Sequence, residues 1–155
     1  MRSALALAAA VATVAAAGGS AAVTAKGDLS YARAYVKAHC RKGAPAPKAA
    51  FWGDAARFNA LYGDCLGGDG RAQHAWFFVG RRFVGLDAPT FSHQIDAEWR
   101  DQSTIAFMYV LFRETDYECC PTGGGRIVRF HWNGKRVVRL DPLPQRAYGG
   151  HGPGR

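Results

Sequence analysis

The sequence lacks the cysteine and histidine spacings that mark metal and redox sites. It has no Cys-x-x-Cys motif and no two histidines separated by three residues, so no spacing predicts a zinc site or a thioredoxin-like centre. It also lacks an apolar run of the roughly 20 residues that a membrane-spanning helix needs, since the longest such run extends from Ala4 to Ala17. Because the cysteine and histidine spacings of such sites are absent, we expect no metal and no cofactor.

The first 25 residues predict a signal peptide. Arg2 provides a positive start, the apolar run follows, and residues 18–20 are small, which is the order found in secretory leaders. We expect cleavage after Ala25 and no transmembrane anchor afterwards, with a permanent membrane anchor as the alternative. The first cysteine is Cys40, so we also expect no lipid attached to a leader cysteine.

The sequence divides into a signal peptide (1–25), a single disulfide-stapled domain (26–141) and a flexible tail rich in proline and glycine (142–155). Acidic residues are scarce. Of the 20 basic side chains only Arg2 lies in the leader, which leaves 19 against 12 acidic ones. A surplus of this sign favours anionic partners, and the leader predicts a secreted or cell-envelope location.

The residue pattern predicts an α+β fold that is mainly β. Ser30 is the expected N-cap of a short helix that ends before Gly43, whereas Phe51 to Tyr62 is ambiguous between a second helix and an irregular segment. From His74 onward, apolar alternation and glycine turns predict about six antiparallel strands. The stretch from Thr104 to Arg113 is apolar on both faces and should be central. We expect a meander that curls into a sandwich or a partial barrel.

Four cysteines, Cys40, Cys65, Cys119 and Cys120, fit the disulfide staples of an exported domain. A bond between the adjacent cysteines would close a strained eight-membered ring, so each is expected to pair upstream. Of the three possible connectivities, we favour the two that join Cys40 and Cys65 to the loop near residue 120. Such a bridge from Cys65 would be worth about 4 kcal/mol in the chain-entropy relation.

The alternative for these cysteines is a redox or metal-binding pair completed by His39 or His131. Other catalytic signals are weak. The glycines at 123–125 lack the Lys and Ser/Thr of a phosphate-binding loop, and the acidic residues show no paired spacing for acid–base chemistry. The acidic residues considered are Asp54, Asp64, Asp96, Glu98, Asp101, Glu114, Asp116 and Glu118.

Basic residues are better organised than acidic ones. Two glycine-turned hairpins carry basic tips, and Arg126, Arg129 and His131 are interpreted as one strand face. A cationic sheet surface would attract anionic envelope polymers or lipid headgroups, and nucleic acid is not an expected partner in this compartment. The alternative is a solvated arginine-rich surface. The candidate anion-binding residues are Arg81, Arg82, Arg129, Lys135, Arg136 and Arg139.

Aromatic residues are expected mostly in the core, with Trp76 left open as part of a ligand platform.

Several motifs along residues 77–144 are distinctive: Cys119, Cys120 and Pro121 in one loop, with Asp116 before them and Thr122 after them. Together with Tyr62–Leu66 and the Asp141–Pro144 segment, they make about half of the mature chain similar to the LppP/LprE family of actinobacterial cell-envelope lipoproteins. The resemblance implies an exported envelope protein whose biochemical role is largely unassigned.

We therefore predict a non-enzymatic binding or structural module of the envelope or the extracellular space. The alternative is a secreted hydrolase or thiol-dependent enzyme whose site the sequence does not reveal.

Overall fold

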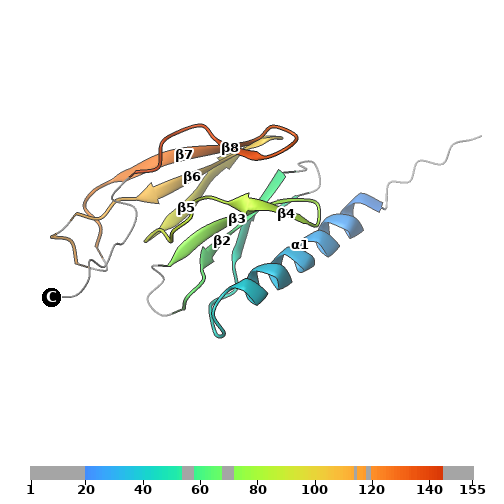
Figure 1. The fold of residues 1–155 in the computed structure, drawn as a ribbon, viewed down its shortest axis with the longest axis horizontal. Helices are drawn as coiled ribbons and strands as arrows, with labels where there is room; N and C mark the ends of the chain where they lie inside the picture. The colour runs from blue at the N-terminus through green and yellow to red at the C-terminus, as the bar shows by residue number, and fades with distance from the viewer. Residues whose placement is uncertain (1–19, 54–57, 68–71, 114, 118–119, 145–155) are drawn as a thin grey trace, which may run out of the picture.

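The computed structural model describes residues 20–53, 58–67, 72–113, 115–117 and 120–144. Within them the chain forms one helix and two four-stranded antiparallel sheets (Figure 1). The elements are α1 (Ser20–His39), β1 (Lys48–Phe51), β2 (Phe58–Asp64), β3 (Gln73–Val79), β4 (Arg82–Leu86), β5 (Ile95–Arg100), β6 (Thr104–Val110), β7 (Gly125–Trp132) and β8 (Val137–Arg139). The predicted α+β, mainly β class is confirmed, and the sheets form an open sandwich.

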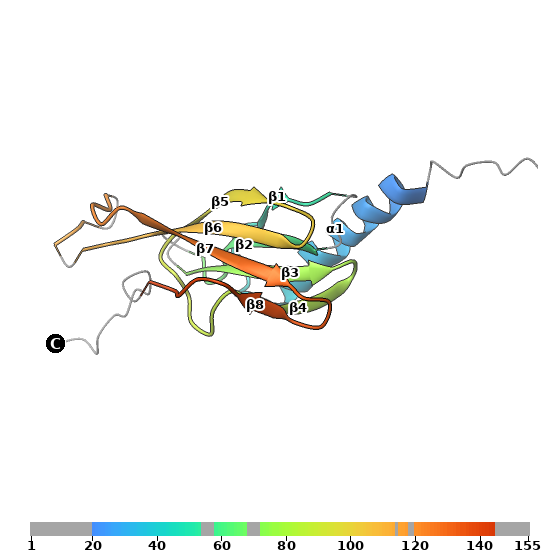
Figure 2. The same ribbon diagram turned by 90° about the horizontal axis from the view of Figure 1, so that it is seen from above.

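Each sheet is a meander, in the order β1-β2-β3-β4 and β5-β6-β7-β8. The sheets face each other so that β4 lies by β8 and β1 by β5 (Figure 2). A Cβ on Gly85 would lie 3.9 Å from Val137, and the Arg100 guanidinium donates to the Phe51 carbonyl at 2.9 Å. The expected central strand is confirmed, because β6 lies between β5 and β7.

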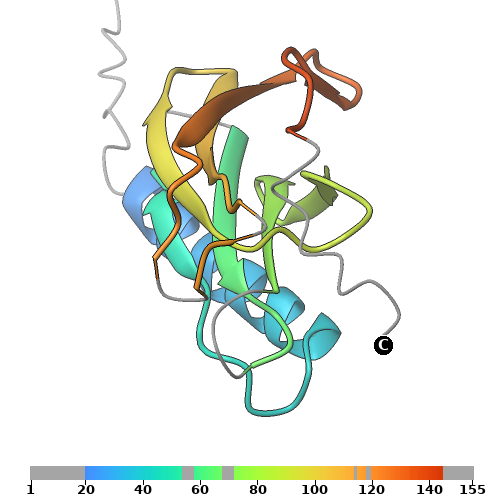
Figure 3. The same ribbon diagram turned by 90° about the vertical axis from the view of Figure 1, so that its left-hand side faces the viewer.

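The first sheet is buried on both faces, between α1 and the second sheet (Figures 1 and 3). Side chains of β3 alternate: Ala75 and Phe77 point into the core between the sheets, whereas Trp76 and Phe78 pack under α1. Alternation along a strand places successive side chains on opposite faces. Trp76 is only 3% exposed, so it belongs to the core and not to the surface platform that the sequence had left open.

The helix begins ten residues earlier than predicted. It starts at Ser20, so Ser30 is an exposed residue inside the helix and not its N-cap. The helix also continues through the expected cleavage site after Ala25. Its end is close to the prediction, since Gly43 takes φ +93° in the turn that follows, where the Ala44 amide donates to the Arg41 carbonyl at 3.0 Å.

The segment left ambiguous by the sequence contains the last residue of β1 and most of β2, two strands that the prediction of about six strands missed. The two hairpins after β3 and β7 were placed correctly. Gly80 adopts φ +56° in the two-residue loop between Val79 and Arg82, a conformation that glycine takes without a Cβ penalty. In the other loop, the Asn133 side chain accepts the amides of Lys135 and Arg136 at 3.0 and 2.9 Å.

The residues just after the predicted end of the domain contact the core. Leu143 packs against the core between the sheets and Pro144 is buried, whereas the sequence placed the end of the domain at residue 141. Among the described residues, no helix combines the length and the apolar character that crossing a membrane requires.

Candidate functional site

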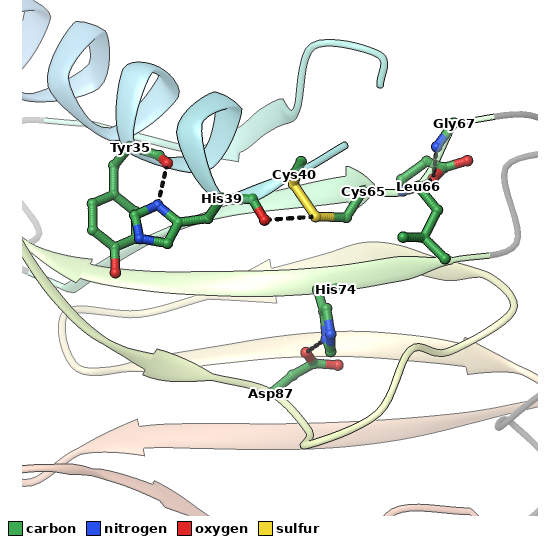
Figure 4. The surroundings of a disulfide bond; sticks show 9 residues. Tyr35, His39, Cys40, Cys65, Leu66, Gly67, His74 and Asp87 are labelled. Carbon is green, nitrogen blue, oxygen red and sulfur yellow. Dashed lines mark hydrogen bonds and ion pairs between the residues drawn. A yellow bond between two sulfur atoms is a disulfide. The ribbon is translucent and has the colours of Figure 1, made fainter. Parts of the chain in front are cut away.

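The disulfide between Cys40 and Cys65 fastens the end of α1 to the end of β2 (Figure 4). Their Cα atoms lie 4.7 Å apart, within the range that a disulfide spans, and the Arg41 amide donates to the Cys65 carbonyl at 2.8 Å. The prediction that these two cysteines bridge to the later loop is therefore wrong. The reason is that β2 returns the chain beneath α1, where Leu61 packs against Val36 and its neighbours.

Cys120 is also disulfide-bonded, and Cys119 lies outside the described residues. The histidines considered as partners of the cysteines have other contacts. His39 stacks on Tyr35 with ring centroids 4.1 Å apart, and His131 lies 3.2 Å from the Thr104 hydroxyl. In the part of the chain that the structure describes, no three His, Cys, Asp or Glu side chains are grouped to hold a metal ion.

The loop between β6 and β7 is organised by Asp116. Its carboxylate accepts the amides of Arg113 and Thr122, both at 2.7 Å, and the Thr122 hydroxyl. These bonds, with the Thr122 hydroxyl first, lower the pKa of Asp116, because they stabilise the charged form. Asp116 therefore holds the loop in shape, and its oxygens are engaged by the protein itself.

A buried polar network that the sequence did not reveal joins β3, β6 and the end of the β3–β4 hairpin. The Asp87 carboxylate accepts the Tyr109 hydroxyl at 2.6 Å and the Ala75 amide at 3.0 Å, and lies 3.0 Å from His74 Nδ1 (Figure 4). Asp87 and His74 are 4% and 5% exposed, too little for a substrate to reach them. The feature that could have indicated this network is the pairing of the β3–β4 hairpin. With Trp76 opposite Leu86, the next pair brings Asp87 to Ala75.

The basic tips of the two hairpins meet at one end of the sandwich. The Arg82 guanidinium lies over the ring of Trp132, 5.4 Å from its centroid, a cation–π geometry. Trp132 ends β7, immediately before the loop of Lys135 and Arg136. Arg81 extends over Tyr31 of α1 at 4.8 Å. We call Arg81, Arg82, Lys135 and Arg136 the tip cluster; all four are exposed.

The other two candidates, Arg129 and Arg139, do not join the tip cluster. Arg129 forms a bidentate ion pair with Asp141, in which both nitrogen–oxygen distances are 2.8 Å. These hydrogen bonds lower the pKa of Asp141 to about 2 and raise that of Arg129. Arg139 lies opposite Phe130 in the register, on the face turned toward the core, whereas Arg129 is on the other face.

The single cationic strand face expected on β7 is therefore absent from the described strand. Arg126 lies on the same face of β7 as the buried Val128 and Phe130, whereas Arg129 and His131 lie on the opposite face. The cationic surface is assembled by turns from two sheets, and not by alternation along one strand.

A second basic site, absent from the sequence-based candidates, lies beside the C-terminal half of α1. A groove of about 850 Å³ runs between this part of the helix and residues 40–47. Four of its lining residues are basic: Arg33, Lys37, Arg41 and Lys42. The one available signal was the four-residue spacing of Arg33, Lys37 and Arg41.

Residues 62–135 match the family model of the LppP/LprE lipoproteins. The match includes the last three residues of β2, strands β3 to β7 and the Asp116 loop, and excludes α1 and the groove. It confirms the resemblance found in the sequence and indicates association with the cell envelope. No curated protein and no solved structure shows significant similarity to the chain.

Proposed function

Taking residues 62–135 as a domain of the LppP/LprE lipoprotein family, we propose that this protein is an exported, non-enzymatic module that binds an anionic polymer of the cell envelope. The binding surface is the tip cluster. The single observation that carries the proposal is the contact between Arg82 and Trp132, because it brings the basic turns of both sheets together.

The charges of the tip cluster are available to a ligand. Among the described residues, no acidic side chain forms an ion pair with Arg81, Arg82, Lys135 or Arg136. The two cation–π contacts orient Arg81 and Arg82 without neutralising them. Arg129, by contrast, is matched by Asp141, so it contributes little to the field outside the protein.

An extended polymer suits this surface better than a small molecule does. The four residues lie on turns and strand ends, and none of them lines the groove beside α1. Each exposed charge pair contributes only about 0–1 kcal/mol, and such contacts become useful when one ligand carries many charges. Because the Debye length is about 8 Å at physiological ionic strength, the attraction should weaken steeply with added salt.

A non-enzymatic role is supported by the burial of the most catalysis-like group. The His74–Asp87 pair is surrounded by protein, and its carboxylate is already occupied by Tyr109 and Ala75. A general base must reach the proton that it removes, which this pair does not.

We further propose export with cleavage after Ala25. The described contacts of α1 with the first sheet use Leu29, Ala32, Tyr35 and Val36, all of which follow that position. Cleavage would therefore shorten the helix and leave its docking intact. Intact mass measurement of protein recovered from the culture medium or envelope tests this, and a retained leader would refute it.

The polymer proposal is tested by replacing all four residues of the tip cluster with alanine and measuring binding to dextran sulfate. The matched control replaces Arg33, Lys37, Arg41 and Lys42 instead, so that both variants lose the same charge. We expect the tip variant to lose most of its binding in low salt and the control to keep most of it. Equal losses would show that net charge alone drives binding and would refute the proposed surface.

A further inference from the structure

The groove beside α1 combines an apolar floor with a basic rim. Seven of its thirteen lining residues are alanine, valine or proline, and two of these, Val36 and Pro47, are buried. Its volume of about 850 Å³ falls within the range of small-molecule sites, which are mostly apolar with a few polar groups that orient the ligand.

All the charged residues that line the groove in the described part of the chain carry the same sign. Arg33, Lys37, Arg41 and Lys42 are exposed, and none of the described residues that line the groove is acidic. In the described part of the chain none of the four forms an ion pair. Arg33 and Lys37 are one helical turn apart, a spacing at which like charges destabilise a helix.

The helix dipole explains only part of this arrangement. A helix C-terminus carries roughly −0.5 of an elementary charge, which favours basic residues such as Lys37 in the last turn. Four cations exceed that charge several-fold, so the groove is strongly positive. It is also fixed in place, because Cys40, one of its lining residues, is bonded to Cys65.

We propose that this groove binds one molecule of a single-chain anionic amphiphile, such as a lysophospholipid with an anionic headgroup. The hydrocarbon chain lies along the floor formed by Val36 and Pro47, and the headgroup lies among the four cations. The long apolar stems of Lys and Arg can cover the hydrocarbon while their charged ends reach the headgroup. This site is separate from the tip cluster and does not depend on polymer binding.

The test is calorimetric titration of the secreted protein with palmitoyl-lysophosphatidylglycerol below its critical micelle concentration. Two variants probe the two halves of the ligand. Lys37→Glu with Arg41→Glu neutralises the rim, because two anions then face the two remaining cations, and Ala34→Trp fills the groove from an exposed position on α1 without changing charge. Circular dichroism and urea unfolding confirm that each variant is folded.

Two controls isolate the site and the headgroup. Arg81→Glu with Arg136→Glu makes the same charge change at the tip cluster, and palmitoyl-lysophosphatidylcholine presents the same chain with a zwitterionic headgroup. We expect one molecule bound per protein, and about tenfold weaker affinity or more in each groove variant. The tip variant should bind as the wild type does, and the zwitterionic lipid should bind at least about tenfold more weakly.

Three results would overturn the proposal. The groove variants could bind as tightly as the wild type, which would place the ligand elsewhere. Inorganic phosphate could compete fully while Ala34→Trp has no effect, which would make the site one for a free anion. Equal binding of both lysolipids would show that the basic rim plays no part in recognition.

Discussion

Loss of the Cys40–Cys65 disulfide should remove a large part of the folding stability. The bond closes a loop with a sequence separation of 25 residues, for which the chain-entropy relation gives about 3.5 kcal/mol at 25 °C. The total stability of a small domain is about 5–15 kcal/mol. We therefore expect Cys40→Ala to lower the free energy of unfolding by about 3 kcal/mol, since α1 loses its covalent attachment to β2.

The pairing itself can be read from the double variant. If Cys40 and Cys65 are partners, Cys65→Ala adds little once Cys40 has been replaced, because the bond is already absent. If each were bonded to the later loop, the second replacement would remove another bridge and cost about 4 kcal/mol more. Non-additivity of this kind is the usual sign that two residues act through one interaction.

Urea denaturation, monitored by circular dichroism, gives the free energy of unfolding of the wild type, both single variants and the double variant. An alkylating agent in the buffer prevents thiol exchange in the single variants. Additive losses in the double variant, or a loss below about 1 kcal/mol in the single variants, well under the typical 2–4 kcal/mol for a disulfide, would refute the reasoning.

Three other substitutions test packing and electrostatics. Leu61→Ala removes a fully buried side chain beneath α1 and should cost about 2–5 kcal/mol in urea denaturation. Tyr109→Phe deletes the hydroxyl that donates to Asp87 and should cost about 1–3 kcal/mol, because a buried oxygen loses its donor. Arg129 holds the pKa of Asp141 at about 2, below its ordinary 3.8, so this pair stabilises the fold above pH 4 and less as pH falls toward 2. Melting temperatures of the wild type and Asp141→Asn should therefore differ at pH 6 and converge near pH 2.

Exposed residues of the same type provide the controls. Leu66 is 44% and Tyr117 is 83% exposed, so Leu66→Ala and Tyr117→Phe should change stability by no more than about 0.5 kcal/mol. A control that costs as much as its buried counterpart would contradict the proposed packing. A difference between the wild type and Asp141→Asn that stays constant from pH 6 to pH 2 would contradict the ion pair.

The hairpins could be predicted because their signals are local. Glycine turns and alternating apolar residues located β3 to β8 correctly. In contrast, β2 contains Asn59, Gly63 and Asp64 and is buried throughout, because α1 covers one face and the second sheet the other. A strand that is buried on both faces has no alternation of period two, so its sequence did not indicate a strand.

The candidate site was predicted only in part, because its assembly depends on contacts that are distant in the sequence. The basic turns were found, but Arg82 meets Trp132 only when the two sheets pack together. Arg129 was included although Asp141 pairs with it, an arrangement that follows from the β7–β8 register. The disulfide was assigned wrongly because the return of β2 beneath α1 was not recognised.

The most direct test of the central claim is a nuclear magnetic resonance titration of the purified protein with a short sulfated oligosaccharide. The account predicts that the amide signals around Arg81–Arg82 and around Lys135–Arg136 shift together, with one affinity that weakens as salt is added. Shifts at only one of the two hairpins, or shifts spread evenly over the basic surface, would contradict a single site built from both.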